Sequence, residues 1–313
     1  MKTLVIPMFS LAATLLSGTA FAAKPVPPLV SPGWIATHSC KPGVVTLDVR
    51  NPIGGGNEQT YLRGHIPCAV YSDYAQNGLW RQDIGGAPGM VPPISELRTL
   101  IGGLGIDNRT HVVIYTAGTS ATDMASAARV FWTFKYLGDN NVSILNGGYA
   151  AYIARGRTPL YPVQTGLVKP IPKTFKTHVK PRLLATEAEV ERAMRSHVPL
   201  VDNRPSSQYL GVNLAPVDKR RGTIPGAHNV PESWLTINDG GVFRTPAELT
   251  KFYKVAGVPI AGTEINFCNT AQWAALGWFA SYELLGNKKA KLYTGSMSQW
   301  SRNPALPIEK QIN

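Results

Sequence analysis

The chain has 313 residues, a formal net charge of +12, six histidines and only three cysteines. The positive charge favours anionic small molecules or anionic surfaces, although the lysines and arginines are scattered as on an ordinary solvated surface. No Cys-x-x-Cys pair occurs, and the histidines lack the spacing of a zinc or copper site, which argues against a dithiol oxidoreductase and a metal centre. An odd cysteine count leaves at least one thiol to explain.

Residues 1–22 are typical of a secretory signal peptide. Lys2 precedes a mostly apolar run, and Ala20-Phe21-Ala22 is a small-x-small cleavage site. Proline, serine and glycine interrupt the run, which falls short of the roughly 20 apolar residues of a membrane span. Cleavage is therefore favoured over an anchor. We expect a periplasmic or secreted protein, away from the membrane after cleavage and without a nucleic-acid partner.

The two halves of the chain contain the same short sequence motifs in the same order, which indicates a duplicated domain. The recurring words are Asp48-Val49-Arg50 with Asp202-Asn203-Arg204, Gly64-His65-Ile66-Pro67 with Gly222-Thr223-Ile224-Pro225, and Asn146-Gly147-Gly148 with Thr294-Gly295-Ser296. We expect one domain over residues 30–160 and a second over 183–309. The proline-rich stretch 161–182 between them is typical of a stiff, extended linker.

Each half alternates short apolar runs with helical patterns. The predicted strands are 44–49, 112–115, 142–145, 200–201, 264–267 and 291–293. The predicted helices are 95–104, 123–137, 186–195, 246–255 and 271–285, with Thr186 and Thr245 as N-caps. Strands alternating with helices predict α/β domains with doubly wound parallel sheets, in which ligands bind at the carboxyl ends of the strands.

Cys268 follows a predicted strand directly and precedes a helix. Loop N–H groups and the positive end of the helix dipole would lower the pKa of a thiol there, and the thiolate is the nucleophile. The alternative is a buried core cysteine, because free cysteine is among the most buried residue types. Aligning the halves places Thr116 where the second half has Cys268, so only the second half is expected to be reactive.

These motifs together resemble the tandem-domain rhodanese family, the thiosulfate and 3-mercaptopyruvate sulfurtransferases, over nearly all of the chain after the signal peptide. The resemblance rests on the repeated words and on Arg129-Val130-Phe131-Trp132, Arg155-Gly156-Arg157-Thr158-Pro159, Phe267-Cys268 and Leu292-Tyr293-Thr294-Gly295-Ser296. It implies two rhodanese-like domains and no cofactor. Cys268 would take a sulfur atom from a small anionic donor as a persulfide and pass it to a thiol or cyanide-like acceptor.

The family resemblance also indicates which residues surround the sulfur. The candidate substrate-binding residues are Asn269, Thr270, Ala271, Gln272, Trp273, Ala274, Asp202, Gln208 and Arg221. Of these, Trp273 is expected mainly to pack in the core, and Asp202 mainly to make a structural hydrogen bond. His65 is also expected to be structural.

Several positions depart from the family pattern. Ala271 replaces a glycine of the loop, which is costly if the backbone there has a positive φ. Thiosulfate-specific members have basic residues at the positions that Thr270 and Gln208 match, so we do not expect a direct cationic clamp on a dianionic donor. The basic run of Lys219, Arg220 and Arg221 is a substitute source of charge or simply a solvated turn.

Two other functions are alternatives to sulfur transfer. A phosphatase of the related cysteine-loop type needs an arginine that closes the loop, but no arginine follows Cys268 until Arg302. A catalytically weak sulfur carrier or binding module stays open because of the departures in the loop. Cys40 and Cys68 flank one strand, and export permits a disulfide between them, a question that the sequence leaves open.

Overall fold

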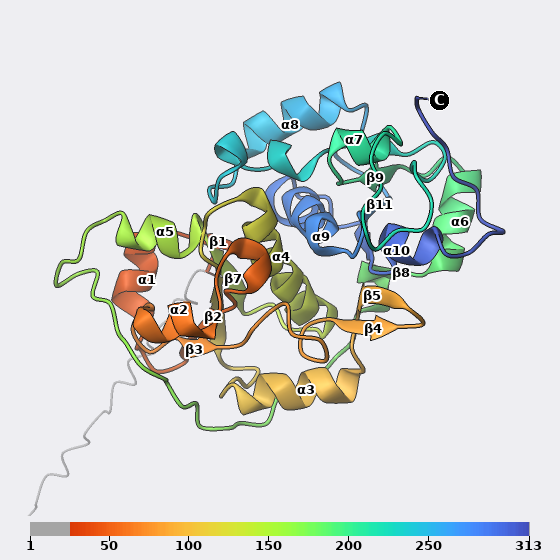
Figure 1. Cartoon of the computed structure of the whole chain (residues 1–313). Coiled ribbons are helices and arrows are strands. Elements are labelled where there is room, and N and C mark those ends of the chain that lie inside the picture. The colour runs from red at the N-terminus through yellow and green to blue at the C-terminus, as the bar shows by residue number, and fades with distance from the viewer. Residues whose placement is uncertain (1–25, 313) are drawn as a thin grey trace, which may run out of the picture.

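Two five-stranded parallel sheets form the framework of residues 26–312, the part of the chain that the computed structural model describes (Figure 1). The predicted signal peptide lies outside these residues. The first sheet has the order β1 (Leu29–Val30), β7 (Val142–Leu145), β6 (His111–Tyr115), β2 (Val44–Asp48) and β3 (Val70–Tyr71). The second has the order β10 (His228–Asn229), β9 (Leu200–Asp202), β11 (Glu264–Phe267), β12 (Ala290–Tyr293) and β8 (Leu184–Ala185).

The second sheet, read from β8 to β10, repeats the strand order of the first, which confirms the duplicated α/β fold. Both faces of the first sheet are covered. Along β6, Val112 and Ile114 point into one hydrophobic cluster, whereas Val113 and Tyr115 point into another. This two-sided burial explains why the central strands are nearly continuous apolar runs in the sequence.

The helices of the first domain are α1 (Pro32–His38), α2 (Glu58–Arg63), α3 (Ile94–Gly103), α4 (Ala121–Tyr136) and α5 (Gly148–Ile153). An antiparallel hairpin of β4 (Gln82–Ile84) and β5 (Ala87–Met90) precedes α3. The second domain has α6 (Glu187–Arg195), α7 (Ser206–Tyr209), α8 (Pro246–Val255), α9 (Gln272–Phe279) and α10 (Ser296–Trp300). As predicted, Thr186 and Thr245 cap α6 and α8, each in a reciprocal capping box.

The predicted helix over 271–285 starts one residue later and has two parts. It is α-helical over Gln272–Phe279 and continues as a π-helical turn over Ala280–Leu284. The segment between the domains is extended, as expected, but it also packs against the first domain (Figure 1). Gln164 pairs with His65 through backbone hydrogen bonds, the Lys173 N–H donates to the Gly102 carbonyl, and Phe175 is buried.

Helices α4 and α9 pack against each other along the boundary between the two domains (Figure 1). Almost every residue of both helices is buried, because each packs on its own sheet and on the other helix. Aromatic rings fill the contact: Phe131 meets Phe279 edge to face at 4.9 Å between centroids, and Phe243 lies 5.0 Å from Phe279. One continuous hydrophobic cluster therefore spans both domains.

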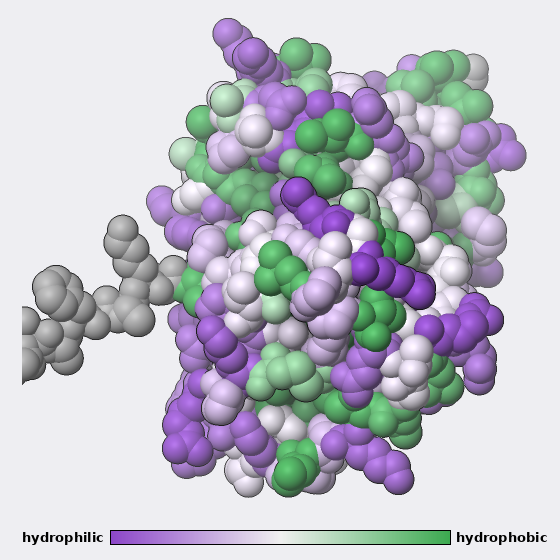
Figure 2. All heavy atoms as spheres, turned by 90° about the vertical axis from the view of Figure 1, so that its left-hand side faces the viewer, coloured by the Kyte–Doolittle hydropathy of each residue, from purple (hydrophilic) through white to green (hydrophobic). Residues whose placement is uncertain are grey.

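The outer face of the first domain shows polar and apolar groups interspersed (Figure 2). This agrees with the scattered lysines and arginines of the sequence. Among residues 26–312, no helix combines the length and the apolar character that a bilayer crossing requires.

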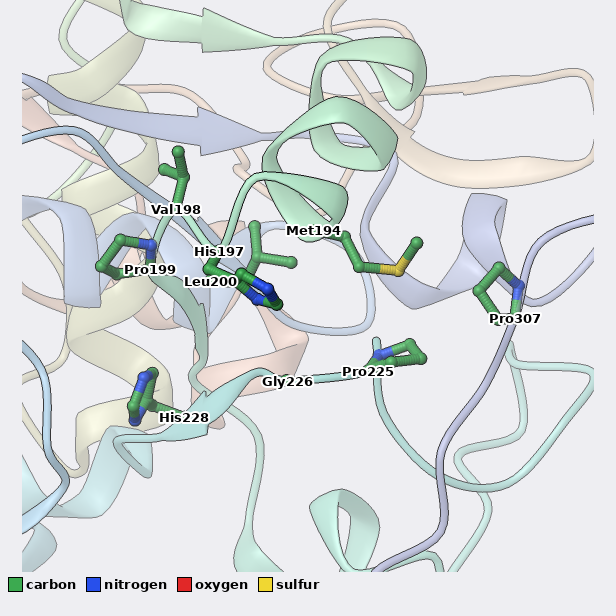
Figure 3. Close-up of a pocket in the computed structure, with 9 residues that line it drawn as sticks. All are labelled: Met194, His197, Val198, Pro199, Leu200, Pro225, Gly226, His228 and Pro307. Carbon is green, nitrogen blue, oxygen red and sulfur yellow. The ribbon is translucent and has the colours of Figure 1, made fainter.

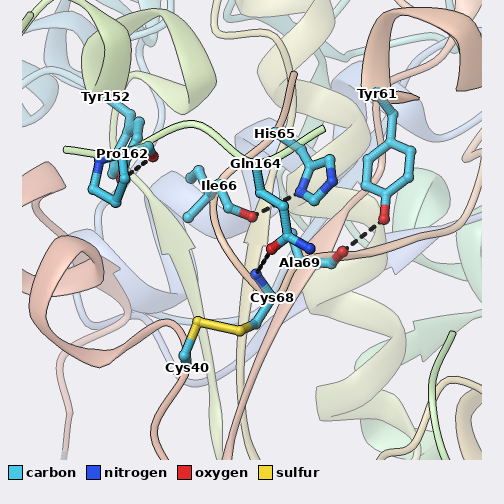
Figure 4. The surroundings of a disulfide bond; sticks show 9 residues. All are labelled: Cys40, Tyr61, His65, Ile66, Cys68, Ala69, Tyr152, Pro162 and Gln164. Atoms are coloured by element: carbon cyan, nitrogen blue, oxygen red, sulfur yellow. Dashed lines mark hydrogen bonds between the residues drawn. A yellow bond between two sulfur atoms is a disulfide. The ribbon is translucent and has the colours of Figure 1, made fainter. Parts of the chain in front are cut away.

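Cys40 and Cys68 form a disulfide bond, with 5.4 Å between their Cα atoms (Figure 4). The bond ties the end of α1 to the turn before β3. Cys68 has φ 61°, close to the 73° of Gly226, its counterpart in the repeat, and its N–H donates to the side chain of Gln164. His65 bonds the carbonyls of Ile66 and Gly166 beside it, which is the structural role expected from the sequence.

The disulfide closes a loop of 28 residues, for which chain entropy predicts a stabilisation of about 3–4 kcal/mol. We expect the double substitution of Cys40→Ser and Cys68→Ser to lower the free energy of unfolding by that amount in a denaturant titration. The untreated protein should show a single titratable thiol after denaturation without reductant. Three thiols in that assay would contradict the bond.

Candidate active site

Cys268 lies at the carboxyl end of β11, between β9 and β12 in the middle of the second sheet. It is the one free cysteine within residues 26–312, and only 1 % of its surface is exposed. The strand-end position is the one predicted from the sequence. The sequence left two alternatives, a reactive thiol at a strand end and a buried core cysteine. The structure combines them, since the thiol lies at the carboxyl end of the sheet, where ligands bind in such folds, and is also buried.

The loop after Cys268 turns sharply into α9 through a left-handed residue. Ala271 has φ 60° and ψ 13°, so this position does favour glycine, as the family pattern indicated. The turn directs the backbone N–H groups of Thr270, Trp273 and Ala274 to the Cys268 sulfur. The sequence-predicted anion-binding loop is therefore present and is formed by main-chain groups.

The expected lowering of the thiol pKa is wrong for the resting protein. Burial raises the pKa of Cys268, and the negative charge of Asp202 adds to that effect. The N–H groups of Ala274, Thr270 and Trp273 lower the pKa, but by less than burial raises it. The sequence argument considered only the loop and the helix, whereas the first domain covers the loop and removes water from the sulfur.

Asp202 supports the site from the end of β9 and is fully engaged. Arg204 binds its carboxylate through two nitrogens, with Nε 2.9 Å from Oδ1 and Nη2 2.6 Å from Oδ2, and the Thr223 hydroxyl donates to Oδ2 at 2.7 Å. Arg204 also donates to the Gly222 carbonyl. The structural role predicted for Asp202 is confirmed, and its oxygens are occupied by these donors rather than presented to a ligand.

Of the remaining candidate substrate-binding residues, Asn269 and Gln208 lie at the Cys268 loop, whereas Arg221 lies away from it. Asn269 donates to the Gln208 side chain at 2.8 Å, which joins the Cys268 loop to α7. Arg221 is instead exposed and lines a separate surface pocket of about 390 Å³ with Arg220, Ile308 and Lys310. The structure does not bring Arg221 to the sulfur, because its side chain points outward while Gly222 next to it faces Arg204.

Gln272 and Trp273 tie the loop to the first domain. The Gln272 amide donates to the Thr122 carbonyl and to the Ser126 hydroxyl, both at 3.0 Å, and the Trp273 indole N–H donates to the Thr122 hydroxyl at 2.9 Å. Trp273 is half-buried, so it combines the expected packing role with a polar anchor. These two side chains act across the domain boundary, which sequence reasoning did not foresee.

The loop from β12 to α10 supports Cys268 from behind and was also missed. The Ser296 hydroxyl accepts the Cys268 N–H at 3.1 Å, the Met297 N–H donates to the Cys268 carbonyl, and the Ser298 N–H donates to the Asn269 carbonyl. The repeated word Thr294-Gly295-Ser296 was the available signal. Its recurrence in both halves marked a loop that each domain needs at the same place.

The hairpin of the first domain covers the Cys268 loop from the front. Gly89 approaches Thr270 so closely that a Cβ atom on Gly89 would lie 2.4 Å from the Thr270 carbonyl oxygen. The Ser298 hydroxyl donates to the Pro88 carbonyl on the same hairpin. The fully buried Arg129 is on α4 as well, three residues after Ser126.

The corresponding loop of the first domain has no thiol, and its backbone N–H groups donate hydrogen bonds to a carboxylate of the protein. Thr116 takes the position of Cys268, and the Asp123 carboxylate accepts the N–H groups of Gly118 and Thr119. A carboxylate of the protein itself thus occupies the anion-binding turn. Within residues 26–312 the free thiol is thus in the second half alone, at the position that the alignment of the halves indicated.

A pocket of about 480 Å³ lies at the opposite edge of the second sheet (Figure 3). Its lining includes Pro199 and Leu200 at the start of β9 and His228 at the start of β10. Because the strands are parallel, this edge is the amino end, away from Cys268. No cluster of three or more metal-ligating side chains occurs within residues 26–312.

Comparison with known proteins matches the rhodanese-like domain model twice, over residues 31–155 and 186–303. The chain belongs to the tandem-domain rhodanese family of sulfurtransferases. It is 31% identical to the thiosulfate sulfurtransferase of Rattus norvegicus, over 91% of this chain and 95% of the relative. It is 29% identical to the sulfur carrier protein TtuD of Thermus thermophilus, over 90% and 96% of the two chains. The crystal structure of the 3-mercaptopyruvate enzyme SseA from Escherichia coli superposes with a TM-score of 0.75 at 27% identity, over 87% of this chain and 99% of SseA.

The left-handed backbone at Ala271 gives a prediction about stability. Ala271→Gly should raise the free energy of unfolding by up to about 1 kcal/mol, because glycine adopts this conformation without a Cβ clash. Ala188, exposed in α6, is the matched control. Ala188→Gly should lower stability, since that residue is in a regular helix. Loss of stability in both variants would contradict the account of the loop.

The raised pKa of Cys268 predicts slow alkylation. In the folded protein the rate of Cys268 alkylation by iodoacetamide should stay low at neutral pH. It should rise only at pH values above those at which an ordinary cysteine ionises, because the raised pKa delays formation of the reactive thiolate to higher pH. The denatured chain, followed by mass spectrometry under the same conditions, is the control. The conclusion would be overturned if the alkylation rate of the folded protein reached its half-maximum at the same pH as that of the denatured chain or at a lower pH.

Proposed function

We propose that the protein moves a sulfane sulfur from a small anionic donor, of the thiosulfate or 3-mercaptopyruvate class, to a thiol or cyanide-like acceptor through a persulfide on Cys268. The main support is the convergence of three N–H groups, from Thr270, Trp273 and Ala274, on the single free thiol. Such preorganised donors are suited to hold an anionic sulfur in a site that excludes water.

In the first half of the cycle, the Cys268 sulfur attacks the outer sulfur of the donor. With thiosulfate, a sulfur–sulfur bond to Cys268 forms, the bond between the two donor sulfurs breaks, and its electron pair leaves with sulfite. The thiol proton leaves with the sulfite as well, so that a neutral thiol and a dianion give a persulfide anion and hydrogen sulfite. The raised pKa of Cys268 makes this coupled proton loss part of the step.

In the second half, the acceptor attacks the outer sulfur of the persulfide. The bond between this sulfur and Cys268 breaks, and its electron pair returns to Cys268 as a thiolate, which regains a proton. A cyanide acceptor leaves as thiocyanate and a thiol acceptor leaves as a persulfide. The loop N–H groups stabilise negative charge on sulfur in both halves, which is how one short loop serves a two-step, covalent mechanism.

We also propose that the protein works outside the cytoplasm. The Cys40–Cys68 disulfide supports this, because such bonds persist in oxidising compartments. The predicted signal peptide points to the same location.

A second function, that of a sulfur carrier with slow turnover, is favoured by one contact. Gln208 stands where thiosulfate-specific relatives have a basic residue, and it is engaged with Asn269 rather than free to bind a donor. The similarity to a sulfur carrier protein agrees with this reading. A carrier would be loaded in the same way but would release sulfur only to a specific protein acceptor.

Intact mass spectrometry tests the proposal. Incubation with thiosulfate or 3-mercaptopyruvate should add the mass of one sulfur atom, and Cys268→Ser should abolish the adduct. Addition of cyanide should remove the sulfur and release thiocyanate if the protein is a transferase. An adduct that persists with cyanide would favour the carrier function. If neither donor loads the wild-type thiol, the persulfide proposal is refuted.

A further inference from the structure

Arg129 is a buried cation without a hydrogen-bond partner. It lies in α4, is 0 % exposed, and none of its three guanidinium nitrogens has a partner within residues 26–312. The other two arginines buried near the sheet ends behave differently. Arg50 and Arg204 each bind an aspartate through two nitrogens and donate to a backbone carbonyl as well. An isolated buried charge is destabilising, so a group of this kind calls for an anion.

The charges that act on Arg129 show what surrounds it. Burial lowers the pKa of Arg129, Tyr74 raises it, Arg81 lowers it and Cys268 raises it. None of these three neighbours is a carboxylate. Its other contact is with an aromatic face, since the guanidinium carbon lies 5.4 Å from the centre of the Trp132 ring. Within residues 26–312, Arg129 therefore has a π face beside it but no counterion.

The direction of the Arg129 side chain follows from its place on α4. Thr122, Ser126 and Arg129 are at positions i, i+4 and i+7 of the helix and so lie along one face. The first two bind Gln272 and Trp273 of the Cys268 loop. Arg129 continues this row, on the face of α4 that packs against α9 and the Cys268 loop. The electrostatic effect of Cys268 on Arg129 agrees with this position.

Tyr74 adds a second unpartnered polar group at the same place. Its side chain is fully buried, and its hydroxyl has no hydrogen-bond partner within the described residues. Arg129, Arg81 and Cys268 all act on its pKa, which burial raises. Arg81 lies over the Tyr74 ring, 6.0 Å from its centre. The first domain thus groups a guanidinium fork, a phenol donor and a second positive charge, and the first two are electrostatically coupled to Cys268.

We infer that Arg129, with Tyr74, binds the oxyanion head of the sulfur donor, a sulfonate or a carboxylate, so that the first domain supplies the anion subsite for the thiol of the second. This inference rests on the proposed function and identifies the residues that select its donor. A guanidinium fork matches two oxygens of either head group, and the buried surroundings strengthen the pairing. It also accounts for the uncharged Thr270 and Gln208, because the charge is delivered from α4 instead.

Binding of unreacted donor to a Cys268→Ser protein tests the subsite without sulfur transfer. Thiosulfate and 3-mercaptopyruvate, titrated separately by calorimetry, report a sulfonate and a carboxylate head. We expect Arg129→Met in this background to weaken binding of at least one of them by about tenfold or more, since a hydrogen-bonded ion pair is lost. Tyr74→Phe should weaken it less. Arg98→Met, which removes an exposed arginine on α3, should change nothing.

Denaturant unfolding separates a binding role from a structural one. Arg129→Met should unfold at the same or a higher denaturant concentration, because it removes an unpaired buried charge. If that variant does not fold, Arg129→Lys, which keeps the charge but not the fork, should still weaken binding. Unchanged affinity in the folded variants, or no binding of either anion to Cys268→Ser, overturns the inference.

The outcomes also separate this inference from the proposed function. If Cys268→Ser binds the anions through Arg129 but the wild-type thiol is never loaded, the subsite stands and the persulfide proposal fails. If the wild-type thiol is loaded and Arg129→Met loads with the same concentration dependence, the persulfide proposal stands and the subsite fails.

Discussion

The packing of α4 against α9 is the contact on which the rest of the site depends. It places the N-terminal end of α9, and with it the Cys268 loop, against a helix of the other domain. Thr122 and Ser126 then anchor Gln272 and Trp273, and the β4–β5 hairpin closes over Thr270. The same contact excludes water from the sulfur and so raises its pKa. A single rhodanese-like domain would leave this loop at a surface.

The two halves show one turn used in two ways. In the first domain a carboxylate from the start of α4 accepts the turn's N–H groups, so the turn is satisfied internally. In the second, the N–H groups of Thr270, Trp273 and Ala274 face the sulfur of Cys268 instead. Both domains keep the buried aspartate–arginine pair at the neighbouring strand end, Asp48 with Arg50 and Asp202 with Arg204. The supporting ion pair is thus present in both halves, whereas within residues 26–312 the free thiol is in the second half alone.

The features that the sequence predicted well are those set by local patterns. Strand ends, helix starts and the caps at Thr186 and Thr245 follow from residues a few positions apart, and the structure places them within a residue or two. The thiol pKa could not be predicted, because it depends on a helix more than a hundred residues away in sequence. Arg221 was misplaced because the direction of a loop side chain is not encoded in its spacing. The disulfide likewise needed the geometry of two separate turns.

The functional interest of Arg129 could have been inferred from the sequence, although not from the spacing of motifs. Arg129 is a charged residue inside an apolar helix that is buried on all sides, whereas residues 277–281, where the repeat places its counterpart, are all uncharged. A charge at such a position in only one copy of a duplicated domain marks a difference in task between the copies. Within residues 26–312, the free thiol is in the second half and the buried arginine without a partner is in the first.

The enclosure of Cys268 has a consequence for the lifetime of the protein. Thiol–disulfide exchange and oxidation both start from an accessible thiolate, so a protonated sulfur with 1 % exposure is shielded from oxidants and from the disulfides of other proteins. Among the three cysteines, the two in the first domain are already joined. The remaining one can stay reduced where exposed thiols are oxidised, because its raised pKa keeps the fraction of reactive thiolate small.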